Sequence, residues 1–233
     1  MSVSFSDRVR RSLLAKTHER SGATLRVWHD QIVVAHYGAP RDERDAAAHL
    51  ALCDLSTLDR TGFKGPDTPA WLADQSVSIP STPNAVVAQS GLITARLSWE
   101  EHLFLRAPFK APSAHPIWQV EPPTHRVYPL PRQDSHAWLY VCGDHAPLML
   151  SYLCAVDFSD PAFTGVAQTS VAKLNAIVIQ DPTSARPGFH LLCDQPSVDY
   201  WWQAVMDAAA PLNGQVVGVD ALLGSTQEQF VTD

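Results

Sequence analysis

The chain has 233 residues, a formal net charge of −7 and a hydrophobic fraction of 45%. A chain of this length can bury a core as one large domain or as two smaller lobes, without disulfides or metals. Its negative charge would repel a phosphate backbone, so we expect no nucleic-acid partner. These values are typical of a globular protein.

We expect a cytoplasmic protein that makes no contact with a membrane. The longest apolar stretch, residues 146–156, is well short of the roughly 20 residues of a membrane helix. Only four residues separate Arg11 from Lys16, and the apolar region of a signal peptide needs about 7 to 15. The four cysteines form no CxxC pair, so we predict buried, reduced thiols.

The first half of the chain is predicted to contain helices followed by strands. A strand at residues 60–64 leads into a Gly-Pro-Asp turn and then a helix whose N-cap is Thr68 and whose first position is Pro69. The predicted helices are residues 6–20, 41–52 and 68–74, and the predicted strands are residues 60–64, 91–97 and 102–106.

A proline-rich segment separates the two halves of the chain. Seven prolines lie between residues 108 and 131. Because proline fixes φ and lacks a backbone N–H donor, this segment is predicted to be an extended connector, without a helix or a central strand.

The second half repeats the pattern of the first. Strand 137–142 precedes a Gly-Asp turn and a helix at 146–155, and strands at 170–180 and 188–194 follow. A last helix is predicted at 197–210. Short turns between strands favour antiparallel pairing. The predicted fold class is α+β, with two similar lobes of antiparallel sheet and helices, at residues 1–106 and 135–233, joined by the connector 107–134.

The inward-facing positions of these elements predict a set of buried side chains, since apolar burial is the main driving force of folding. They are Phe63, Trp71, Leu72, Leu139, Leu148, Leu153, Ile177, Val178, Leu191, Trp201 and Val205.

Common catalytic and nucleotide-binding motifs are missing. The sequence contains neither GxxxxGK[ST] nor GxGxxG, so we expect the chain to bind no FAD or NAD alone. HExxH and GxSxG are also missing, which disfavours a metal site and serine hydrolysis.

Four segments carry a family resemblance. CDLSTLDRTGFKGPDTPAWLADQ, residues 53–75, resembles the early segment of glycine-cleavage T proteins. Residues 83–105, 156–181 and 189–209 are similar to gamma subunits of heterotetrameric sarcosine oxidase. The resemblance implies a T-protein-like fold that lacks the C-terminal barrel. It further implies alpha-type and beta-type partner subunits that carry FAD, FMN and NAD, and a possible tetrahydrofolate pocket completed by another chain.

The resemblance also implies which residues would surround a folate, namely Leu58, Thr94, Arg96 and His190. T proteins carry an acidic pair where this sequence has Thr94 and Ala95, and a pterin-binding glutamate where it has His190. The arginine expected shortly after Asp220 is missing as well. Thr94 and Ala95 cannot accept a proton near neutral pH, and a neutral imidazole lacks the two acceptor oxygens of a carboxylate.

These departures favour a noncatalytic gamma-type subunit of a sarcosine or N-methyl amine oxidase that feeds one-carbon units to tetrahydrofolate. Two alternatives remain open. The chain could be a standalone tetrahydrofolate-dependent aminomethyltransferase or folate-binding protein, or it could have an unrelated fold.

Overall fold

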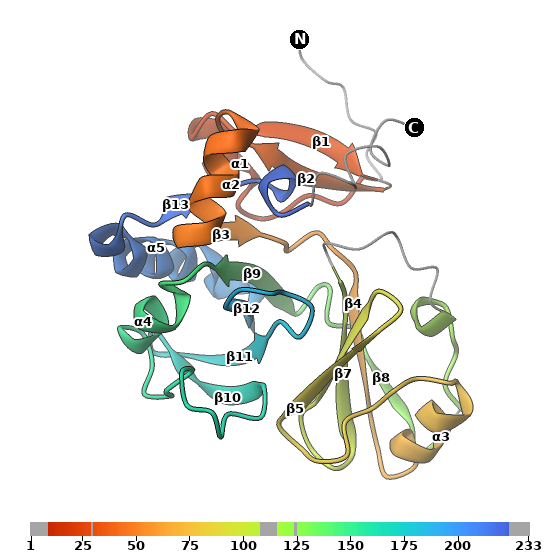
Figure 1. Cartoon of the computed structure of the whole chain (residues 1–233). Coiled ribbons are helices and arrows are strands. Elements are labelled where there is room, and N and C mark those ends of the chain that lie inside the picture. The colour runs from red at the N-terminus through yellow and green to blue at the C-terminus, as the bar shows by residue number, and fades with distance from the viewer. Residues whose placement is uncertain (1–8, 29, 108–115, 124, 224–233) are drawn as a thin grey trace.

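The computed structural model describes residues 9–28, 30–107, 116–123 and 125–223. Two β-sheets form most of the molecule, one of six strands and one of five, and a separate two-stranded hairpin lies beside the larger sheet (Figure 1). The predicted α+β class and the predominance of antiparallel pairing are confirmed.

The six-stranded sheet takes strands from both halves of the sequence. Adjacent strands of this sheet are antiparallel, except that β13 pairs with β3 in parallel. In sheet order the strands are β10 (Val166–Val171), β11 (Leu174–Gln180), β12 (Gly188–Asp194), β9 (His136–Cys142), β3 (Ala51–Asp54) and β13 (Gln215–Val216).

The five-stranded sheet is antiparallel throughout. Its order is β5 (Ala85–Gln89), β6 (Leu92–Arg96), β7 (Glu101–Arg106), β4 (Arg60–Lys64) and β8 (Tyr128–Leu130). The hairpin consists of β1 (Thr24–Trp28) and β2 (Gln31–His36).

Five α-helices and four short 3-10 helices complete the described part of the chain. They are α1 (Ala15–Arg20), α2 (Pro40–His49), α3 (Thr68–Asp74), α4 (Ala146–Ser151), α5 (Val198–Ala209), η1 (Pro116–Trp118), η2 (Gln195–Ser197), η3 (Ala210–Leu212) and η4 (Val219–Ala221). No helix in this part of the chain is long and apolar enough to cross a membrane.

The repeated unit predicted from the sequence is present in the structure. The order β5-β6-β7-β4 in one sheet matches the order β10-β11-β12-β9 in the other, and a helix follows the first strand of each unit. Gly65 and Gly143 occupy equivalent turns, with φ of +138° and +111°. Because these φ values lie where side chains are rarely tolerated, both turns require glycine.

Three clusters of buried side chains form the core. One lies between the six-stranded sheet and helices α4 and α5. The second fills the space between the two sheets, where Trp138 and Tyr140 of β9 are in the same cluster as Ile93 and Ala95 of β6. The third lies under α3. The faces of β6 and β9 therefore alternate between two different cores.

The elements at the ends of the units differ from the sequence predictions. The helix predicted at 41–52 ends at His49, and β3 follows directly, because Leu50 takes an extended conformation with ψ of 118°. The strand predicted at 170–180 is a hairpin, since Ala172 and Lys173 turn the chain with positive φ. Of the helix predicted at 6–20, only 15–20 is helical, and residues 6–8 lie outside the described residues.

Most of the predicted core is buried, but Leu148 is 45% exposed. The helix pattern placed Leu148 inward, whereas Ala146, Met149 and Leu150 are the residues of α4 that pack on the sheet. Trp71, Leu153 and Ile177 are partly buried.

The lobe boundaries at 106 and 135 remain a prediction. Part of the predicted connector, residues 108–115 and 124, lies outside the described residues. The remainder contains η1 and the edge strand β8. The sheets cross the proposed boundaries, because β3 precedes the connector in sequence and pairs with β9 after it.

Candidate functional site

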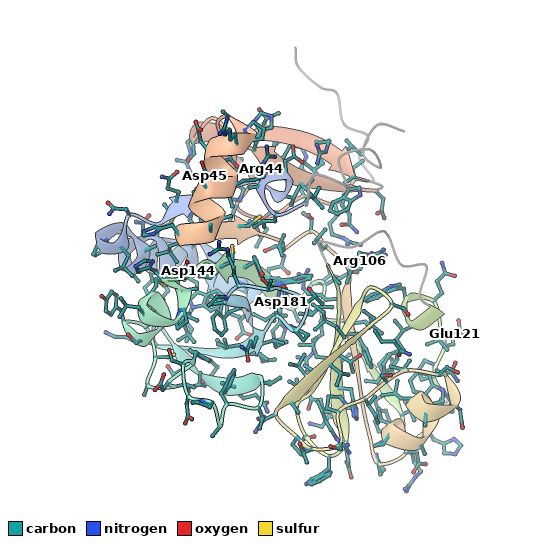
Figure 2. All side chains as sticks on the ribbon, viewed as in Figure 1. Arg44, Asp45, Arg106, Glu121, Asp144 and Asp181 are labelled. Atoms are coloured by element: carbon teal, nitrogen blue, oxygen red, sulfur yellow. The ribbon has the colours of Figure 1, made fainter. Side chains whose placement is uncertain are left out.

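The candidate site is a hollow of about 370 Å³ where α2, the end of β9, the loop 181–187 and η4 meet. This volume is within the range of small-molecule sites, roughly 300–1,000 Å³. The hollow is lined by Arg44, Ala47, Ala48, Tyr140, Cys142, Thr183, Ser184, Ala185, Arg186, Ala221 and Leu222. Figure 2 labels Arg44 on α2 and, below it, Asp181, which follows β11 and lies beside the start of β12.

A hydrogen-bonded pair, Tyr140 and Asp181, borders the hollow, and of the two only Tyr140 lines it. The Tyr140 hydroxyl donates to Asp181 Oδ2 at 3.0 Å. Asp181 Oδ1 accepts from the backbone N–H and the hydroxyl of Thr183, at 2.8 and 2.7 Å. Burial, and then the neighbouring Asp181, raise the pKa of Tyr140 well above its ordinary value. The phenol therefore stays protonated at neutral pH.

A glycine allows the Tyr140 ring to lie across β12. A Cβ atom at Gly188 would clash with the Tyr140 hydroxyl oxygen and would lie 3.0 Å from Cζ. The close approach of β12 to this ring therefore depends on the absence of a side chain at residue 188.

His190 is completely buried beside this pair. Its Nδ1 accepts a hydrogen bond from Trp138 Nε1 at 3.2 Å, so the neutral ring carries its proton on Nε2. That nitrogen lies 3.8 Å from Asp181 Oδ2 and has no hydrogen-bond partner. Burial lowers the pKa of His190 to about 4, against the opposing effect of Asp181. The imidazole is therefore neutral at pH 7.

The four residues predicted to surround a folate do not come together. Leu58 belongs to the core between the sheets, and His190 faces the same side as Leu192 on β12. Thr94 and Arg96 point to the opposite face of β6, because Ile93 and Ala95 face the core between the sheets. None of the four lines the hollow.

Arg96 is held by backbone carbonyls. Its guanidinium donates to the carbonyl oxygens of Pro80, Ser81 and Trp99 at 2.9 to 3.1 Å. The same group lies 4.9 Å from the centre of the Trp99 ring. Arg96 thus stabilises the loop between β6 and β7 through Trp99. It does not line the hollow.

No described residue of the lining is an aspartate or a glutamate. Burial, followed by the effect of Asp181, raises the pKa of Cys142 to about 12, so this thiol is a poor nucleophile at neutral pH. With Tyr140 also protonated, the lining offers hydrogen-bond donors and positive charge but no general base.

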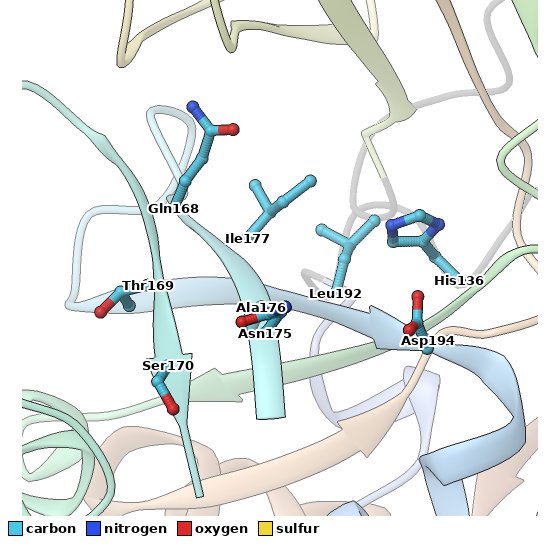
Figure 3. A pocket seen from close by; sticks show the side chains of 9 residues that line it. All are labelled: His136, Gln168, Thr169, Ser170, Asn175, Ala176, Ile177, Leu192 and Asp194. Carbon is cyan, nitrogen blue, oxygen red and sulfur yellow. The ribbon is translucent and has the colours of Figure 1, made fainter. Parts of the chain in front are cut away.

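A second hollow of about 370 Å³ lies on the outer part of the six-stranded sheet. Figure 3 shows Gln168, Ile177, Leu192 and His136 side by side along one face of β10, β11, β12 and β9. Gln168 Nε2 donates to the carbonyl oxygen of Leu97 at 2.7 Å, which links this face to the five-stranded sheet.

A buried polar relay lies under the hairpin. Asp54 Oδ2 is 2.9 Å from His18 Nε2, and His18 Nδ1 is 2.7 Å from the Tyr37 hydroxyl. Burial, then the neighbouring Cys53, raises the pKa of Tyr37 above its ordinary value. The adjoining cavity of about 10 Å³ has room for about one water molecule. This relay is therefore too enclosed to hold a substrate.

Sequence reasoning missed the residues that line the hollow. Asp181-Pro182-Thr183 directly follows a predicted strand, and such a sequence indicates a side-chain-capped turn. The position of Tyr140 beneath that turn depends on the pairing of β9 with β12, which no local pattern specifies.

The sequence matches no family model and no curated protein. Among solved structures, the glycine cleavage system aminomethyltransferase T from Bartonella henselae is similar, with a TM-score of 0.69 and 14% identity. The chain has a T-protein-like fold. The match covers 91% of this chain and 60% of that protein, so the chain spans about three fifths of the T protein's length.

Heterotetrameric sarcosine oxidase from Corynebacterium sp. U-96, in complex with pyrrole 2-carboxylate, is also similar, with a TM-score of 0.56 and 18% identity. This match covers 74% of the present chain and 92% of the matched chain. At these identities the likeness concerns the fold. It bears out the resemblance noted in the sequence, and no closed barrel occurs among the described residues.

Proposed function

We propose that the chain is a noncatalytic gamma-type subunit of a heteromeric sarcosine or N-methyl amine oxidase that supplies one-carbon units to tetrahydrofolate. The main support is the extent of the structural match, which includes 92% of a chain from a heterotetrameric oxidase but only 60% of a T protein. The oxidase chain is thus matched almost in full, whereas about two fifths of the T protein lies outside the match.

The chemistry of the described residues supports the same proposal. Thr94 and Ala95, which replace the acidic pair of T proteins, are almost completely buried. His190 is neutral at pH 7 and bonded to Trp138. A general acid or base must reach the reacting group, and none of these three side chains lines the hollow.

Part of the surface suits a permanent partner. Leu148 and Tyr152 are four residues apart at α4, and they are 45% and 55% exposed. Residues at this spacing share one face of a helix. Together with Tyr200 of α5, which is 52% exposed, they provide apolar side chains of the kind that obligate interfaces cover.

Purification of the tagged chain from its native cells tests the proposal. We expect alpha-type and beta-type chains to co-purify in fixed stoichiometry, with flavin absorbance and sarcosine-dependent oxidation by the complex but not by the isolated chain. Recovery of the chain only as a free monomer without flavin would contradict the proposal.

Folate binding by the chain itself is the second candidate function, and the 370 Å³ hollow favours it. Calorimetric titration with tetrahydrofolate distinguishes the two candidates. Saturable heat at high micromolar concentration, lost when Tyr140 is changed to Trp to fill the hollow, would support a folate-binding module. Absence of heat would leave the subunit role.

A further inference from the structure

Within the described residues, β10 has the longest unprotected edge of the two large sheets. The other edge strands are β13, with two residues, β8, with three residues including Pro129, and β5, whose start is joined to Gly165 by an isolated bridge. β10 has six residues, and Figure 1 shows it as the outermost strand of its sheet. Proteins usually protect such an edge with a short strand, proline or charge.

The backbone groups of β10 alternate between its partner strand and the outer side. The carbonyl oxygen of Gly165 accepts a hydrogen bond from the last residue of β11 at 2.8 Å, whereas Val166 N–H donates outward to Asn84 at 3.0 Å. By the alternation of an antiparallel ladder, Gln168 and Ser170 direct their N–H and C=O groups outward. Both residues are exposed. Among the described residues, no backbone group pairs with them on that side.

The free edge carries no charge. Residues 161–172 contain no aspartate, glutamate, lysine or arginine, although the whole chain has a net charge of −7. Like charges directly opposite one another destabilise a strand pair. Two copies of β10 would therefore meet without this repulsion.

We infer that two copies of the chain pair antiparallel through β10, with the two-fold axis at Thr169. Gln168 of one copy then lies opposite Ser170 of the other. Since each of these residues has one donor and one acceptor, the pairing makes four hydrogen bonds and joins the two six-stranded sheets into one. A two-fold interface requires a surface that is complementary to itself, and this edge meets that condition.

Only this register uses all the free backbone groups. A register shifted by two residues would pair Ser170 with Val166, whose N–H is already bonded, or Gln168 with Ala172, which lies in the turn after β10. The inference does not depend on the proposed subunit role, because it rests on the edge alone.

Sedimentation velocity of the isolated chain measures the association. We expect a monomer–dimer equilibrium with a dissociation constant on the order of 50 µM, since the interface is small. Ser170→Pro removes an outward N–H without breaking the ladder with β11, a change that an edge strand tolerates. It should weaken the dimer at least about tenfold.

Ala88→Pro is the matched control. Ala88 precedes the turn of Ser90 and Gly91 by two residues, as Ser170 precedes the turn of Ala172 and Lys173, and all four turn residues have positive φ. This variant removes the equivalent N–H from β5 and should dimerise like the unmodified chain. Thermal unfolding shows whether both proline variants are folded.

A disulfide tests the register. In a two-fold pair centred on Thr169, the two Thr169 Cα atoms would lie about 4.5 Å apart, within reach of a disulfide. In a Cys154→Ser background, which removes the partly exposed native thiol, Thr169→Cys treated with oxidised glutathione should give a covalent dimer on a non-reducing gel. Val87→Cys, at the equivalent position of β5, should remain a monomer.

Three results would overturn the inference. They are a chain that stays monomeric at about 500 µM, ten times the expected dissociation constant, equal effects of Ser170→Pro and Ala88→Pro on the dimer, and equal cross-linking at Thr169→Cys and Val87→Cys. If Ser170→Pro does not fold, the cross-linking decides, because Thr169→Cys keeps every backbone donor. Co-purification with flavin-containing chains is a separate measurement, so failure of the dimer leaves the proposed subunit role unaffected.

Discussion

Burial restricts the protonation and the hydrogen bonding of His190. The family resemblance places it among the residues that would surround a folate. In the structure it has no solvent exposure and accepts a hydrogen bond from Trp138. Because its pKa is lowered to about 4, it cannot donate from both nitrogens at neutral pH, so it contributes to packing.

Replacing His190 with glutamate should destabilise the protein without creating folate affinity. The new carboxylate would be buried near Asp181, and an uncompensated buried charge costs about 3–5 kcal/mol. Urea unfolding measures the loss, with His190→Gln as a milder control of similar size. A stable His190→Glu variant that binds tetrahydrofolate tightly would contradict the noncatalytic proposal.

Asp54 should make stability depend on pH. Although burial alone raises the pKa of Asp54, hydrogen bonds from His18, Ser12 and Ser56 hold it below its ordinary value. A carboxyl group with a depressed folded-state pKa stabilises the fold above its unfolded-state pKa of about 3.9, and this contribution is lost as the pH falls through the folded-state value.

The Asp54→Asn variant should therefore lose about 1–3 kcal/mol at pH 7, because the amide cannot accept all the hydrogen bonds that this buried carboxylate accepts from its neighbours. The difference from the unmodified chain should shrink below about pH 4. Chemical unfolding between pH 3 and pH 7 measures both quantities. A difference that stays constant over this range would show that the Asp54 charge does not contribute.

At the scale of elements, the two repeated units depend on one turn geometry. Gly65 follows β4 and Gly143 follows β9, and each N–H donates to a carbonyl of a neighbouring segment, that of Glu100 or of Pro187. A Cβ atom at either glycine would clash with a backbone carbonyl, that of Arg126 or of His49. The turns therefore hold each unit against a segment that is distant in sequence.

Gly65→Ala and Gly143→Ala should each cost about 2 kcal/mol or more. Both variants combine a left-handed backbone, which costs roughly 1–2 kcal/mol for residues with a side chain, with the clash just described. Gly22→Ala is the control, since Gly22 also has positive φ, +79°, but no atom within 4 Å of the added Cβ. Equal losses at all three positions in thermal unfolding would show that the clashes are relieved.

At the scale of the whole molecule, Arg60 connects the two sheets. It lies on β4 and is 2% exposed. Its guanidinium donates to the carbonyl oxygens of Ser56, Leu58, Arg132, Gln133 and His136. Burial lowers the pKa of Arg60 to about 10, so the group remains charged at neutral pH. Its hydrogen bond to His136 therefore links the start of β9 to the five-stranded sheet.

Arg60→Lys should destabilise the protein by at least about 3 kcal/mol. Lysine keeps the charge but cannot reach five carbonyls, and each buried group left unpaired costs about 1–3 kcal/mol. Arg126→Lys, at an exposed ion pair, should leave the unfolding midpoint unchanged. An Arg60→Lys variant of normal stability would mean that water replaces the lost donors.

The sequence by itself determined the class of fold and the repeated units, because these depend on local features. Strand 60–64, helix 68–74 and strand 188–194 have the predicted bounds, since alternation of side chains, proline at a helix start and glycine at a turn act within a few residues. The predicted N-cap of the helix was wrong, because Asp67 and not Thr68 occupies that position.

Only the tertiary structure decided how those elements combine. The pairing of β3 with β9 joins residues more than 80 positions apart. Together with the pairing of β9 with β12, it brings Tyr140, Arg44 and the loop 181–187 around one hollow. Thr94 and Arg96 are separated from His190 because they lie on the face of β6 opposite to Ile93 and Ala95, which face the core between the sheets. Which face of a strand meets another sheet is set by long-range packing, and local sequence patterns do not contain that information.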